Sequence, residues 1–248
     1  MGMRAPAPYA QRTQPSLSRK HSSGNRMLDS LPPDDFKRFV PHLQEATFPL
    51  STVLFRPEDE IEYAYFPTTC IVSLLTQLED GSGLEVGLVG KEGVAGVSAI
   101  LGGTETKVAT VQAAGSALKI RVGAFRDEFK RGGALQASVL RYLHALMTQI
   151  SQSAVCNIRH PVPGRLARWL LMYHDRLGKD EFELTHEFMA AMLGVRRSGI
   201  SETAAVLQRK GLIAYRRGRV KILDRSGLES FACECYPVVK VKYDDLIL

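Results

Sequence analysis

The 248-residue sequence predicts an α+β fold with an antiparallel β domain, one long helix and a winged helix-turn-helix. Three observations predict it. Short runs rich in Val, Ile, Tyr and Phe alternate with turn formers in the first half of the chain. A helical stretch without internal Gly or Pro follows, and two short helical patterns then precede a glycine-tipped hairpin. At this length we expect two compact units and a connector.

Residues 1–26 are expected to form a disordered tail. They carry five cations, no acid and scattered Pro, Ser and Gln, a composition that cannot pack a core. An organelle transit peptide would look similar. A start codon assigned too far upstream, with Met27 as the true first residue, would also explain this composition.

Residues 27–132 are expected to form the β domain. Short β-prone runs bounded by turn formers are typical of antiparallel strands. Asp80-Gly81, between two of these runs, is a hairpin signal. The runs are residues 52–56, 63–67, 71–78, 84–89, 107–113 and 117–122.

Residues 133–159 are expected to form a dimerisation helix. Val139, Leu143, Leu146 and Ile150 follow a 4-3-4 spacing, which is typical of a heptad seam between two chains. The polar Ser153 and Asn157 continue the spacing and weaken the end of the seam. A second interpretation is a single stripe that faces the core of its own chain, which apolar periodicity does not exclude.

Residues 160–236 are expected to form the second domain, and residues 237–248 a C-terminal tail. Pro161 and Pro163 interrupt helical structure, so the segment 160–164 is the expected hinge. A helix should follow over 165–177 and end at Gly178.

The segment 184–209 predicts a helix-turn-helix. Thr185 is a suitable N-cap for a helix over residues 186–192. Gly194 can adopt the left-handed conformation that the tight turn needs, and Val195 should fill the angle between the helices. The second helix, over 196–209, places Ile200, Ala204 and Leu207 on one face.

The segment 213–222 predicts a basic wing, because two short strand patterns flank Gly218. From Arg159 to Ile222 the chain has 13 Lys or Arg and 6 Asp or Glu, a net charge of +7, against +6 for the whole chain. Such a concentration of positive charge is what binding to DNA phosphates requires. Two helices joined by a Gly turn are common in protein cores, and a basic hairpin alone can be an ordinary surface strand pair. The order helix, turn, helix and basic hairpin is more specific and favours DNA binding.

On these residues the chain resembles the Crp/Fnr (cyclic-AMP receptor protein/fumarate-nitrate regulator) family of bacterial transcription regulators. The resemblance covers nearly everything after Met27 and is strongest in residues 184–201, Leu207 and 211–213. It implies a β-roll of the cyclic-nucleotide-binding type for residues 27–132. It also implies a homodimer that binds double-stranded DNA and contacts RNA polymerase.

The resemblance also implies a set of DNA contacts. Arg197 stands where the family usually has a contacting Arg, whereas Ser198 replaces its common Glu and Glu202 its common Arg, so we expect a different operator sequence. The expected groove contacts are Arg196, Arg197, Ser198, Gly199, Ser201 and Glu202. The expected phosphate contacts in the wing are Arg216, Arg217 and Arg219.

The effector site departs from the family pattern. Val94 stands where cyclic-AMP binders have a Glu after a Gly, here Gly93, and Lys107-Val108 stands near their Arg-Ser. We therefore expect a degenerate pocket formed by these residues and no response to cyclic AMP. The signal is not identified, and a constitutive DNA binder with a vestigial sensor fits equally well.

Other functions have little support. Residues 1–27 contain no Cys for an iron-sulfur cluster, Cys233 and Cys235 alone are too few ligands for a metal, and the His residues show no metal-binding spacing. We expect no cofactor, no metal site and no enzymatic activity. No apolar stretch spans a bilayer, and we expect a cytoplasmic protein. The alternative function is a ligand-binding or protein-interaction module without specific DNA binding.

Overall fold

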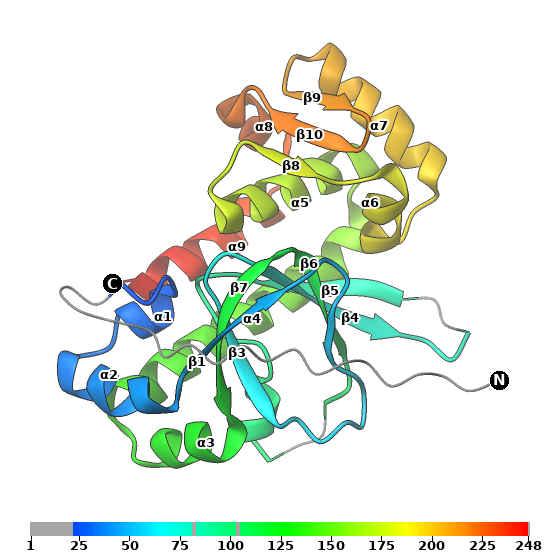
Figure 1. The fold of residues 1–248 in the computed structure, drawn as a ribbon. Coiled ribbons are helices and arrows are strands. Elements are labelled where there is room, and N and C mark those ends of the chain that lie inside the picture. Colours follow the sequence, from blue (N-terminus) through cyan, green and yellow to red (C-terminus); the bar gives the residue numbers. More distant parts are fainter. Residues whose placement is uncertain (1–21, 81–82, 103–104, 248) are drawn as a thin grey trace.

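The computed structural model describes residues 22–80, 83–102 and 105–247. It places a β-roll at one end of the molecule and a winged helix-turn-helix at the other, with the long helix α4 beside the β-roll (Figure 1). The predicted α+β fold is confirmed. Among the described helices, none is long and apolar enough to cross a membrane.

The N-terminal domain consists of two antiparallel sheets with short helices at their ends. One sheet has the strand order β1-β7-β3 and the other the order β2-β6-β4-β5. The strands are β1 (Gln44–Phe48), β2 (Val53–Phe55), β3 (Tyr63–Pro67), β4 (Ile71–Gln77), β5 (Gly83–Val89), β6 (Val108–Ala113) and β7 (Gly115–Arg121). The helices are α1 (Arg26–Asp29), α2 (Pro33–Phe39), η1 (Val40–His42), η2 (Val97–Ile100) and α3 (Val122–Lys130).

Six of these seven strands follow the predicted runs closely. Strand β1 was not predicted, because it is a largely exposed edge strand without an apolar run. Aromatic packing closes the end of the roll. The rings of Phe39, Phe66 and Phe125 meet edge to face at 5.5–5.9 Å and thereby join α2, β3 and α3.

The expected N-terminal tail is shorter than predicted. Residues 1–21 lie outside the described part, but Asn25 is fully buried. Its side-chain amide donates to the carbonyl oxygens of Pro67 and Gly93, at 2.9 Å each, and its Oδ1 accepts from the backbone N–H of Leu28. A buried amide with three partners is part of the fold, so the folded region begins before Met27.

The C-terminal half contains the long helix and the second domain. Its elements are α4 (Gly133–Arg159), α5 (Val162–Leu177), β8 (Glu181–Glu183), α6 (His186–Leu193), α7 (Arg197–Arg209), β9 (Ile213–Arg216), β10 (Arg219–Ile222), α8 (Arg225–Phe231), α9 (Cys235–Asp244) and η3 (Asp245–Ile247). Only His160 and Pro161 separate α4 from α5. Pro163 lies in the first turn of α5, where its missing N–H costs no hydrogen bond.

The predicted dimer seam on α4 needs correction. Val139 is fully buried within its own chain and Leu146 is 8% exposed, while Leu143 and Ile150 pack partly buried against the same core. Buried side chains cannot contact a second chain, so this row is the core-facing stripe. The exposed row of α4 is shifted by one position and has the same 4-3-4-3-4 spacing. It consists of Leu140, His144, Met147, Ser151, Ala154 and Ile158.

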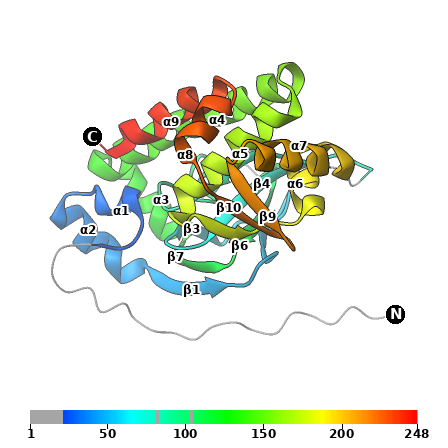
Figure 2. The same ribbon diagram turned by 90° about the horizontal axis from the view of Figure 1, so that it is seen from above.

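The expectation of a C-terminal tail over residues 237–248 is also wrong. Residues 237–244 belong to helix α9, which lies beside α4 (Figures 1 and 2). Val239 and Tyr243 are buried, and the Tyr243 hydroxyl donates to Gln149 Oε1 on α4 at 2.7 Å. Residues 239–242 alternate Val and Lys as a strand would. Packing on α4 overrides that local preference.

The two domains share one hydrophobic core through α5 and strand β5. At this contact Trp169 Nε1 donates to Glu85 Oε1 at 2.7 Å, and Ser73 donates to Glu85 Oε2 at 2.7 Å. Burial disfavours the charged form and raises the pKa of Glu85 to about 7, although the two donors partly oppose that effect.

The pKa of Glu85 predicts a pH-dependent stability. Because the folded chain holds this proton to higher pH than the unfolded chain, the free energy of unfolding should fall as the pH rises from the ordinary carboxyl value to about 7. Between about pH 5 and pH 8, the free energy of unfolding of Glu85→Gln should fall by roughly 2–3 kcal/mol less than that of the native chain, because the Gln side chain remains neutral. Urea unfolding at both pH values measures it. The exposed Glu45→Gln is the control, and an unchanged pH dependence in Glu85→Gln would contradict the assignment.

Candidate functional site

Helices α6 and α7 form the predicted helix-turn-helix. Thr185 Oγ1 accepts from the backbone N–H of Phe188 at 3.1 Å, so the predicted N-cap is present. Gly194 has φ 61°, the left-handed conformation expected for the turn. Helix α7 begins at Arg197, with Arg196 as its N-cap. The residues that pack the two helices together are Met189, Met192, Ile200, Ala204 and Leu207, all buried.

The start of α7 presents most of the predicted groove contacts to solvent. Arg196, Arg197, Ser198 and Glu202 are exposed. A Cβ built on Gly199 would meet no atom within 4 Å, so nothing in this chain requires Gly at that position. Polar side chains and an unobstructed backbone at a helix start can approach the edges of bases.

The wing is a tight hairpin between β9 and β10. Arg217 and Gly218 occupy its turn with φ 51° and 76°, and two successive positive φ values are typical of a type I′ hairpin turn. Arg216, Arg217 and Arg219 are all exposed. Strand β8 pairs with the other side of β10, so the small sheet has the order β8-β10-β9.

A contact that the sequence did not reveal joins the helices to the wing. The imidazole of His186 stacks on the Tyr215 ring with centroids 4.2 Å apart, and Ser201 Oγ lies 2.8 Å from His186 Nδ1. Burial, helped by the charge of Arg197, lowers the pKa of His186. Ser201 is half-buried and engaged within the domain, whereas the side chains of Arg196, Arg197, Ser198 and Glu202 are exposed.

Acidic neighbours neutralise two of the predicted DNA-contacting cations. Arg197 Nε lies 2.7 Å from Glu187 Oε1, and Arg219 contacts Glu183 at 3.0 Å and Glu181 at 4.0 Å. All of these side chains are more than half exposed, and such ion pairs contribute only about 0–1 kcal/mol. These cations can therefore exchange a carboxylate for a phosphate at little cost.

The predicted effector residues lie in packed parts of the β-roll. Val94 is buried in the core, and a Cβ on Gly93 would lie 2.1 Å from the Tyr142 ring of α4. Lys107 Nζ is paired with Glu105 Oε1 at 3.1 Å, and Glu105 also accepts from Ser98 Oγ at 2.5 Å. Burial and these bonds act in opposite directions, and together they lower the pKa of Glu105.

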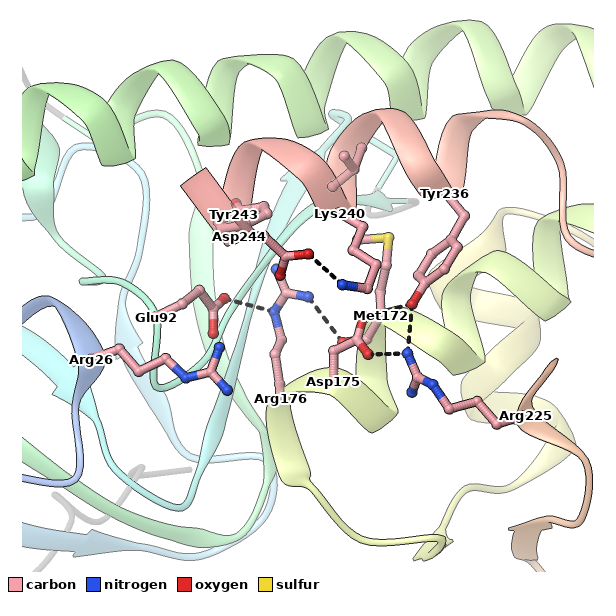
Figure 3. Close-up of a pocket in the computed structure, with 11 residues that line it drawn as sticks. Arg26, Glu92, Met172, Asp175, Arg176, Arg225, Tyr236, Lys240, Tyr243 and Asp244 are labelled. Atoms are coloured by element: carbon pink, nitrogen blue, oxygen red, sulfur yellow. Dashed lines mark hydrogen bonds and ion pairs between the residues drawn. The ribbon is translucent and has the colours of Figure 1, made fainter. Parts of the chain in front are cut away.

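A polar pocket of about 180 Å³ lies elsewhere, between the β-roll, α5 and α9 (Figure 3). The buried Arg176 Nε contacts Glu92 Oε1 at 2.9 Å, and Arg176 also donates to Gln149 Oε1 at 3.0 Å. At the other end of the pocket, Asp175 binds Arg225 at 2.7 Å. The sequence analysis did not predict this pocket, because its walls come from segments far apart in the chain.

Three of the four cysteines gather at one place in the fold. Cys70 is buried alone in the β-roll, whereas Cys156, Cys233 and Cys235 meet His160 at the end of α4. Among the described residues, this is the group whose donor atoms could hold a metal ion.

Comparisons with known proteins agree with this geometry. Residues 164–231 match the family model of the Crp-like helix-turn-helix domain. A comparison with curated protein sequences found no significant relative.

Solved structures are similar over nearly their whole length. A putative Crp/Fnr-family regulator from Eubacterium rectale has 16% identity and a TM-score of 0.65, over 85% of this chain and 99% of its own. FixK2 from Bradyrhizobium japonicum has 15% identity and a TM-score of 0.67, over 77% and 98%. The regulator TTHA1359 from Thermus thermophilus has 21% identity and a TM-score of 0.63, over 76% and 97%. The resemblance noted in the sequence is thus confirmed: the chain has the fold of the Crp/Fnr family of transcriptional regulators and carries a Crp-like helix-turn-helix domain.

Proposed function

We propose that the protein is a homodimeric, sequence-specific DNA-binding transcription regulator that does not respond to cyclic AMP. The observation that carries the proposal is the arrangement of exposed cations. The start of α7 and the tip of the wing both present arginines to solvent. His186 of α6 connects the two elements, because it stacks on Tyr215 of the wing and contacts Ser201 of α7. This arrangement suits a helix in the major groove with a wing on the adjacent phosphates.

The exposed row of α4 supports the homodimer. Met147 is 65% exposed and Ile158 82% exposed, and both lie on one face of a 27-residue helix. Apolar side chains gathered in this way on a helix surface are typical of an interface. A second copy of α4 packed against this row would place two α7 helices on one side of a duplex, where about 34 Å separates successive major-groove sites.

Three features support the absence of a cyclic-AMP response. Val94 lies in the core instead of offering a carboxylate to a ribose, Tyr142 packs against Gly93, and Glu105 already neutralises Lys107. A nucleotide bound in the family manner would have to displace these contacts. RNA polymerase is the partner that the family resemblance implies.

Substitution of Arg197 tests the DNA contact. Arg197→Ala should lower affinity for duplexes enriched by the native chain from a random library by about 1–3 kcal/mol per half-site and relax base preference. Fluorescence anisotropy at several salt concentrations measures both. Arg131→Ala is the matched control, because Arg131 is similarly exposed and paired with Glu128 on α3. Binding that does not weaken with salt, or a failure to enrich any duplex, would favour the protein-interaction alternative.

Substitution of Gly199 tests the close approach of the α7 backbone. Gly199→Ala should stabilise the fold by up to about 1 kcal/mol, because the helix gains propensity and the methyl group meets open space. The same methyl group should weaken binding to the enriched duplex. Gly123→Ala in α3, equally unobstructed, should stabilise without affecting DNA. Unchanged DNA affinity in Gly199→Ala would show that the backbone there is not close to the bases.

Substitution of Met147 tests the corrected dimer seam. Met147→Glu should convert the dimer into a monomer, because it places two charges in an apolar interface. Light scattering after size-exclusion chromatography gives the mass. Leu50→Glu, at a similarly exposed position between β1 and β2, should remain a dimer. A dimer that persists in Met147→Glu would mean that another surface pairs the chains.

A further inference from the structure

Four potential ligands converge where the long helix ends. Cys156 lies in the last turn of α4 and His160 is its C-cap, while Cys233 lies between α8 and α9 and Cys235 is the first residue of α9. One donor atom from each residue lies within 4.8 Å of all the others. Cys233 and Cys235 alone would be too few ligands for a metal ion. The second pair of ligands comes from a segment more than 70 residues earlier.

Two of the six distances between these donors are close to those of a tetrahedral site. Cys156 Sγ lies 3.4 Å from Cys233 Sγ, and Cys235 Sγ lies 3.6 Å from His160 Nδ1. Tetrahedral zinc with Zn–S of about 2.3 Å and Zn–N of about 2.0–2.1 Å requires S···S of about 3.8 Å and S···N of about 3.6 Å. Donors this close together suit a single ion. A multi-iron cluster would spread the thiolates over different irons.

The surroundings supply the second set of contacts that such a site needs. His160 Nε2 lies 3.0 Å from Glu234 Oε1, so a carboxylate orients the ring with Nδ1 toward the thiols. Histidine ligands commonly donate their other ring N–H in this way, which fixes the tautomer. The arrangement is therefore that of a metal ligand together with its orienting carboxylate.

Two buried arginines beside the cluster provide an independent observation. Arg165 and Arg168 are 6% and 3% exposed, and neither forms an ion pair with a carboxylate among the described residues. Arg168 donates to Ser153 Oγ, one turn before Cys156, and the Nε atoms of both arginines have no hydrogen-bond partner. Buried cations require compensation. Three thiolates around a divalent ion carry a net charge of −1, which would offset one of these two positive charges.

We propose that Cys156, His160, Cys233 and Cys235 bind one Zn²⁺ ion as a structural Cys₃His site. The ion would join three segments: the end of α4, the hinge at His160 and Pro161, and the turn that leads into α9. A long backbone hydrogen bond already connects the turn before α9 to the start of α5, since the N–H of Cys233 donates to the carbonyl of Gly164 at 3.4 Å. Zinc thereby fixes the angle at which α5 leaves α4. This proposal does not depend on the proposed DNA binding.

The metal content of the full-length chain tests the proposal. The untagged protein, purified with a reductant and without chelator, should contain close to one zinc per chain by plasma mass spectrometry. Cys156→Ser, Cys233→Ser and Cys235→Ser should each lose most of the zinc. Cys70→Ser should retain it, because Cys70 is a buried thiol outside the cluster.

Measurements on the native chain keep the test valid if a variant fails to fold. Cobalt in place of zinc should give the intense visible bands of tetrahedral thiolate coordination. Removal of zinc with a chelator should lower the Tm, and zinc alone should restore it, because the ion binds the folded state preferentially. A native chain without metal, with a Cys156–Cys233 disulfide in mass spectrometry, would overturn the proposal. So would iron with acid-labile sulfide, or zinc that Cys70→Ser removes and the other variants retain.

Discussion

The packing of α5 and α6 against strand β5 sets where the helix-turn-helix lies relative to the β-roll. Trp169 and Arg176 both reach from α5 into the β-roll, to Glu85 and Glu92 respectively. These polar groups are buried, so their contacts offset a desolvation cost instead of adding much net stability. They define how the second domain is oriented on the β-roll, because each donor can reach its acceptor only when the two domains are packed in this orientation.

The proposed DNA-binding surface extends this orientation outward. Arg165, in the first turn of α5, donates to the carbonyl of Leu193 in α6 and to Asn157 Oδ1 in α4 at 2.9 Å, so the helix-turn-helix is tied to the end of the long helix. The cations on α7 and the wing remain exposed, and the acids that pair with Arg197 and Arg219 are exposed as well. The interior of the domain is an apolar core, whereas its outer face carries charges that can change partners.

The long helix α4 has two distinct faces, and its end is where three segments meet. One face packs into the β-roll and the other exposes an apolar row of the same heptad spacing. Helix α9 lies beside α4, and Tyr243 and Arg176 share Gln149 as an acceptor. A metal ion at the end of α4 would connect this arrangement to the hinge. The proposed dimer interface, the hinge and the helix-turn-helix domain would then be coupled through one helix.

Local patterns in the sequence predict the helix-turn-helix, its N-cap at Thr185, its turn at Gly194, the basic wing and most of the β-strands. These features depend on signals within a few residues, such as a capping hydroxyl, a glycine with positive φ or an apolar run between turn formers. The packing of the whole chain establishes which face of α4 is exposed, because apolar residues occupy both faces and the two rows have the same spacing. It also establishes that residues 237–244 are helical, because contact with α4 outweighs their strand-like alternation, and that Cys156 and His160 lie beside Cys233 and Cys235. That last proximity results from the path of the chain through the whole second domain, which no local pattern encodes.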